Sequence, residues 1–84
     1  MDISKILRPA ANVILCCYQY RNIPLNFTKI SKMTGLSYSH VVKFIYQNED
    51  IFLTDAKGRS VTIILSNKGV QIGEFLSAMF EALK

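Results

Sequence analysis

The sequence predicts a mainly α-helical domain with one small β-hairpin, an α+β fold, organised as a single domain over residues 1–84. Up to about residue 48, apolar side chains recur at the three- and four-residue spacing of helices. After that point, "IFLT" and "SVTIIL" are rich in the β-branched and aromatic residues typical of strands. Capping and turn residues separate these segments. The predicted order is helix, short strand, helix, helix, strand, strand, helix.

The first long helix is expected to end at about residue 20. Asp2 or Ser4 can cap a helical segment at the start of the chain, and Pro9 either kinks it or occupies the first turn of the next helix. The run "AANVILCCYQY" is apolar on nearly every side, and a helix without a polar stripe is buried all round. In a domain this small, such burial predicts an oligomer interface.

Two adjacent cysteines lie inside this helix. A bridge between Cys16 and Cys17 would be strained, and with His40 as the only histidine the chain offers no metal-ligand spacing. We interpret both cysteines as small buried hydrophobic residues, and the alternative is an intersubunit disulfide. Neither a cofactor nor a metal site is predicted.

Residues 26–48 carry the signals of two short helices joined by a tight turn. Pro24 breaks the first long helix and sits in a short extended piece. Asn26 is expected to cap the helix "FTKISKM", Gly35 to end it at positive φ, and Ser37 to cap the next helix.

Apolar spacing predicts which faces of these two helices are buried. Phe27, Ile30 and Met33 share one face of the first. The inward residues of the second, which runs to about residue 48, are expected to be Val41, Phe44, Ile45 and Asn48. Its other face carries Tyr38, Ser39, Val42, Lys43, Tyr46 and Gln47.

Residues 51–65 are predicted to form a hairpin, with the turn in "DAKGR" placing Lys57 and Arg59 at its tip. Ser66 or Asn67 then caps a last helix to about residue 83, whose apolar residues cover more surface than one small core can bury. This surplus again predicts a dimer. Small residues that permit a close helix crossing recur every four positions at Gly69, Gly73 and Ser77.

The positive charge of the chain is concentrated in its first half. The net charge is +4, and no acidic residue lies between Asp2 and Glu49. The cations in that stretch are Lys5, Arg8, Arg21, Lys29, Lys32 and Lys43. Such a segment would repel no phosphate, whereas the alternative, a solvated basic face, usually mixes both signs.

Composition also argues against several classes of protein. No apolar run approaches the ~18 residues of a membrane span, and "MDISKILRPA" lacks the features of a signal peptide. We therefore expect a cytoplasmic protein with no membrane association. An enzyme is not expected, because the chain has no second histidine, no paired acids in its basic stretch and no glycine-rich phosphate loop.

The order of these elements resembles the winged helix-turn-helix domain of MarR-like transcriptional regulators and of small archaeal and archaeal-virus regulators. The resemblance covers about residues 10–75. "LNFTKISKMTGLSYSHVVKFI" is similar to the strand, positioning helix, turn and recognition helix of that domain. "ILSNKGVQIGEF" is similar to the segment that leads from the wing to the dimerisation helix. If the chain is viral, its location would be the host cytoplasm.

The resemblance assigns roles to particular positions. The base-contacting residues in the major groove would be Tyr38, Ser39, His40, Val42 and Lys43. Phosphates would be held by Lys29, Lys32 and Ser37, and the minor groove by Lys57 and Arg59 of the wing. The dimer interface would contain Ile6, Leu7, Ile14, Cys17, Ile72, Phe75, Leu76, Met79, Phe80 and Leu83.

The function that follows from the resemblance is DNA binding by a homodimeric transcription regulator. Its two recognition helices would lie about 34 Å apart in successive major grooves. With Lys43 as its one cation, the recognition helix suits phosphate and shape readout more than base reading. The alternative is a winged helix that serves as an interaction or assembly module within a transcription or replication complex. No small-molecule effector is evident.

Overall fold

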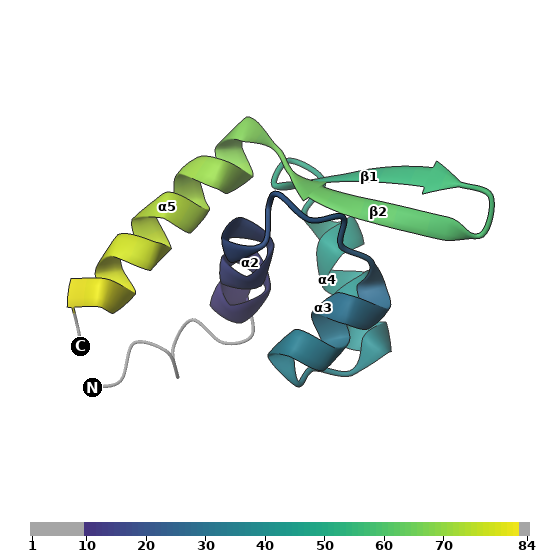
Figure 1. Cartoon of the computed structure of the whole chain (residues 1–84), viewed down its shortest axis with the longest axis horizontal. Coiled ribbons are helices and arrows are strands. Elements are labelled where there is room, and N and C mark those ends of the chain that lie inside the picture. Colours follow the sequence, from purple (N-terminus) through teal and green to yellow (C-terminus); the bar gives the residue numbers. More distant parts are fainter. Residues whose placement is uncertain (1–9, 83–84) are drawn as a thin grey trace.

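The computed structural model describes residues 10–82. Its elements are α2 (Ala10–Gln19), α3 (Phe27–Thr34), α4 (Tyr38–Gln47), β1 (Phe52–Lys57), β2 (Ser60–Leu65) and α5 (Asn67–Ala82). Figure 1 shows α2, α3 and α4 grouped together, the hairpin extending to one side, and α5 running back past α2. The predicted mainly α fold with a small β-hairpin is confirmed. None of the helices within residues 10–82 is both long and apolar enough to cross a bilayer.

The hydrophobic core is built around α2, which contributes five buried residues. Against it pack α3, β2 at the base of the hairpin and the middle of α5, while α4 packs on α3. The buried side chains are Ala11, Val13, Ile14, Cys16, Cys17, Leu25, Phe27, Ile30, Val41, Ile45, Phe52, Ile63 and Leu76. The apolar character of α2 is thus largely satisfied within one chain.

This core corrects part of the predicted dimer interface. Ile14, Cys17 and Leu76 are buried against other elements of the same chain, so they offer almost no surface to a second copy. The predicted contacts at Ile6, Leu7 and Leu83 lie outside the described residues. On α5, in contrast, the side chain of Phe75 is 67% exposed.

In place of the short strand predicted around Pro24, the structure has a single β-bridge between Leu25 and Ile63 of the hairpin. The N–H of Ile63 donates to the carbonyl oxygen of Leu25 over 2.9 Å, and both side chains are buried. This contact fixes the base of the hairpin to the segment that enters α3.

The hairpin has a shorter turn than the predicted one. Its antiparallel register pairs Phe52 with Leu65 and continues to Lys57 and Ser60. Two residues remain for the turn, and Gly58 adopts φ 61°, as the first central position of a type II′ turn requires. Most of "DAKGR" therefore belongs to β1.

α5 begins at a serine cap. Ser66 Oγ accepts from the N–H of Gly69 over 3.1 Å and donates to the carbonyl oxygen of Asp50 over 2.6 Å. The predicted close helix crossing is found where Gly73 of α5 lies against Tyr18 of α2. Gly73 thus allows the close approach of α5 to α2, whereas Gly69 lies against Ile51 and Leu65.

Candidate nucleic-acid interface

Both helices of this pair, α3 and α4, begin at a side-chain cap. Asn26 Oδ1 accepts from the N–H of Lys29 over 2.8 Å, and Ser37 Oγ accepts from the N–H of His40 over 3.2 Å. Gly35 adopts φ 76°, and its N–H donates to the carbonyl oxygen of Ser31. These capping interactions set the start of α4 relative to α3.

A second set of bonds ties the end of α3 to the turn. Ser31 Oγ donates to the carbonyl oxygen of Leu36 over 2.6 Å. Thr34 Oγ1 donates to the carbonyl oxygen of Ile30 over 2.7 Å and accepts from the N–H of Leu36 over 3.3 Å. Because the turn is bonded from both helices, α3 and α4 are held as one unit.

The outward face of α4 carries several polar side chains and lies along an open hollow. Residues along this helix line an open hollow of about 490 Å³: Ser37, Ser39, His40, Lys43, Phe44 and Gln47. Ser39, Lys43 and Gln47 follow one another at four-residue intervals, which places them on one helix face. Gln47 was not among the predicted site residues, although its spacing from Lys43 would have identified it.

Two predicted base-contacting residues lie away from the centre of this face. Val42 is partly buried against the core, which corrects its expected place on the outward face of α4. Tyr38 is exposed, but its ring packs edge-on against Phe27 with 6.0 Å between centroids. The Tyr46 ring lies against the same Phe27 ring, with 5.7 Å between the two centroids. This aromatic group joins α4 to the start of α3.

A smaller hollow of about 210 Å³ links the wing to the two helices. Its lining comes from the start of α3, the first residue of α4 and the tip of the hairpin: Asn26, Phe27, Thr28, Tyr38, Arg59, Ser60 and Val61. Arg59 is thereby placed beside the start of α4. Lys57 points its ammonium group toward Asp55, with 3.7 Å between Nζ and Oδ2, and both side chains are exposed.

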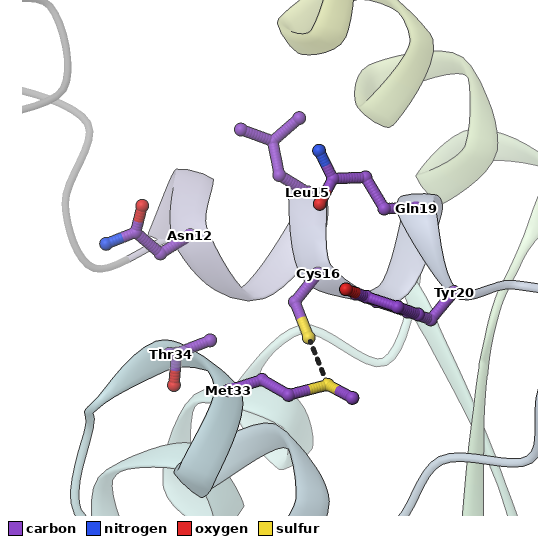
Figure 2. Close-up of a pocket in the computed structure, with 7 residues that line it drawn as sticks. All are labelled: Asn12, Leu15, Cys16, Gln19, Tyr20, Met33 and Thr34. Carbon is purple, nitrogen blue, oxygen red and sulfur yellow. Dashed lines mark hydrogen bonds between the residues drawn. The ribbon is translucent and has the colours of Figure 1, made fainter.

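The cations of α3 are exposed, as predicted for phosphate contacts. Lys32 lies in the last turn of α3, and Lys29 Nζ donates to the carbonyl oxygen of Pro24 over 3.4 Å. The prediction that Met33 is buried with Phe27 and Ile30 on one face of α3 is wrong, because Met33 is 49% exposed. Its side chain reaches toward α2 instead of entering the core (Figure 2).

Comparison with known proteins places this geometry in a known fold. Neither a protein-family model nor a curated protein sequence matches the chain. Among solved structures, MepR, a transcription regulator of the Staphylococcus aureus multidrug efflux pump MepA, aligns over 96% of this chain and 64% of its own, with a TM-score of 0.81 and 14% identity. The chain has a winged helix-turn-helix fold.

Other structures share this winged helix-turn-helix fold. The MarR family transcriptional regulator SPO1453 from Silicibacter pomeroyi aligns over 95% of this chain and 62% of its own, with a TM-score of 0.79 and 19% identity. AF1382 from Archaeoglobus fulgidus aligns over 99% of this chain and 98% of its own, with a TM-score of 0.87 and 19% identity. The chain therefore spans less than two thirds of MepR and SPO1453 but nearly all of AF1382. MepR has also been crystallised with DNA.

Proposed function

We propose that this protein is a DNA-binding transcription regulator that inserts α4 into the major groove. The observation that carries the proposal is the outward face of α4, where Ser39, His40, Lys43 and Gln47 are exposed together. A major groove admits an α-helix, and these side chains are donors and acceptors for base edges and phosphates. MepR, which has the same fold, forms a complex with DNA.

The residues around α4 also support an arrangement in which its outward face is turned toward DNA. Lys29 and Lys32 on α3 are exposed cations, and residues 10–48 contain no acidic side chain. Phosphate contacts from such a segment meet no like charge. Arg59 lines the hollow beside Tyr38, and its position next to α4 supports a role for it in the adjacent minor groove.

The proposed active form is a homodimer that uses the outer face of α5. Phe75 is the most exposed of the large apolar side chains in the part of the chain that the structure describes. Ile72, Met79 and Phe80 on the same helix are partly exposed. A dimer formed there would present two α4 helices to successive grooves and could block polymerase at a promoter.

Anisotropy titrations of a fluorescent duplex, repeated over a range of salt concentrations, test the DNA-binding role. Lys43→Ala should weaken binding and reduce the slope of log K against log salt by about 0.9, the value for one lost phosphate contact. Lys68→Ala is the matched control, because Lys68 is already paired with Asp50 at 2.8 Å on another part of the molecule. Equal isotherms for wild type and Lys43→Ala would refute the role of α4.

The alternative, a protein-interaction or assembly module, is favoured by one feature of the wing. Leu53 and Ile64 face each other across the hairpin, and each is 48% exposed. An exposed apolar pair is better suited to contact another protein than to contact a phosphate backbone. Failure to shift any random duplex at micromolar protein and low salt would select this alternative.

A further inference from the structure

Two sulfur atoms from different helices meet outside the proposed DNA interface. The thiol of Cys16 on α2 donates to Sδ of Met33 on α3 across 3.5 Å. Figure 2 shows both side chains directed toward each other across the gap between the helices. Cys17, the neighbouring cysteine, is buried in the core and does not line this gap.

The sulfur pair lies in an open hollow of about 410 Å³. Apart from Leu15, the other side chains that line it carry polar atoms: Asn12, Gln19, Tyr20 and Thr34. Cys16, at the inner wall of the hollow, is only 7% exposed, whereas Met33 is 49% exposed. A small ion from solvent can therefore reach both sulfurs by displacing only the exposed end of the methionine side chain.

The chemistry of the two groups is that of soft ligands. A thiolate and a thioether together select Cu(I) over the hard cations that prefer oxygen. Burial raises the pKa of the Cys16 thiol, which leaves the free group protonated at neutral pH. Binding would break the S–H bond, form an S–Cu bond and release the proton to solvent, with no change in the oxidation state of copper or sulfur.

We propose that Cys16 and Met33 form a two-sulfur binding site for Cu(I) between α2 and α3. The juxtaposition of a thiol and a thioether in one solvent-open hollow carries the proposal. The bound ion would connect α2 to the last turn of α3, next to Thr34, whose hydroxyl is bonded into the turn before α4. The site shares no residue with the proposed DNA interface, so the two proposals can fail separately.

Anaerobic competition with a coloured chelator tests the site. Cu(I) is supplied as its bicinchoninate complex, and loss of colour reports transfer to the protein. The wild type is expected to take up one Cu(I) per chain, and Cys16→Ala to take up none. Met33→Leu should weaken binding by at least about tenfold, the range that even outer-shell partners of metal ligands contribute.

Two matched variants control for the loss of sulfur elsewhere. Cys17→Ala and Met79→Leu remove one thiol and one thioether outside the hollow and should bind as the wild type does. Circular dichroism checks that each variant is folded, and Met33→Leu is expected to fold because its side chain is half exposed. The proposal would be overturned if Met33→Leu bound Cu(I) as tightly as the wild type does. It would also be overturned if each ion were shared between two chains, or if no Cu(I) were transferred to the protein.

Discussion

Gly73 lies directly against Tyr18, so that a Cβ atom built on the glycine would stand 2.7 Å from Cβ of the tyrosine and 2.8 Å from its Cγ. The Tyr18 ring is also covered by the Arg21 guanidinium, 4.2 Å from the ring centroid. We expect Gly73→Ala to lower the free energy of unfolding by about 1–3 kcal/mol through overpacking. This loss should exceed the gain of about 1 kcal/mol in helix propensity.

Urea denaturation measures the effect of Gly73→Ala. Gln71→Ala, on the exposed face of the same helix, is the control and should change stability by less than about 0.5 kcal/mol. A Gly73→Ala protein more stable than the wild type would mean that α2 and α5 are not in close contact at this position.

The turn before α4 depends on the backbone of Gly35. Its φ of 76° is left-handed, while the space around it is open. We therefore expect Gly35→Ala to destabilise the protein by about 1–2 kcal/mol from backbone strain alone. Gly35→Asn should cost less, because asparagine adopts this conformation more readily. Thermal unfolding of the three proteins tests this order, and equal stability of the alanine variant would contradict it.

Cys17 should make stability fall at alkaline pH. Burial raises the pKa of the Cys17 thiol to about 12, with a smaller effect from the neighbouring Cys16. In the unfolded chain the pKa of a thiol is about 8.5. Since the folded pKa is the higher one, the contribution of Cys17 is fully present below pH of about 8.5 and is lost as pH rises toward 12. Urea unfolding of Cys17→Ala should depend less on pH between about 8.5 and 11. Parallel profiles for the two proteins would refute this assignment.

Arg59 should contribute more to DNA binding than Lys57 does. Arg59 lines the hollow beside Tyr38, whereas the charge of Lys57 is partly offset by Asp55. In anisotropy titrations, Arg59→Ala is expected to reduce the salt slope by about 0.9, and Lys57→Ala by less. Asp55→Asn should strengthen binding. An Arg59→Ala protein that keeps the wild-type slope would show that the wing tip does not contact phosphate.

Phe75 should be essential for the proposed dimer. Placing a charge on this exposed side chain with Phe75→Glu is expected to give a monomer in sedimentation equilibrium, because an unpaired charge is costly to bury at an apolar interface. Leu53→Glu, on the exposed face of the wing, serves as the control and should remain dimeric. A wild-type protein that sediments as a monomer at high concentration would contradict the dimer.

The parts of the fold that depend on local chemistry could be predicted from the sequence. Asn26, Ser37 and Gly35 act at the predicted positions, because caps and positive-φ turns are set by residues within one helical turn. The side-chain environments of Val42 and Met33 could not be predicted, since they depend on how α4 and α3 rotate against α2. Periodicity specifies an apolar stripe but not which partner covers its edges.

The same limitation explains the error in the predicted dimer interface. An apolar helix such as α2 can be buried by a second copy or by its own chain, and its sequence is the same in both cases. Here α5 approaches closely enough, through Gly73, to cover the side of α2 that carries Tyr18. The contribution of that glycine is visible only once the two helices are placed together.

The pairing of β1 with β2 has a consequence for solubility. Within residues 10–82, β1 forms its ladder with β2 alone, so the other edge of this strand is open to any extended chain. Natural proteins guard such edges with charged side chains. Asp55 and Lys57 both lie on β1. In the proposed DNA complex, Asp55 would weaken the attraction of the wing to phosphate, but it also opposes the strand-to-strand stacking from which insoluble fibrils grow.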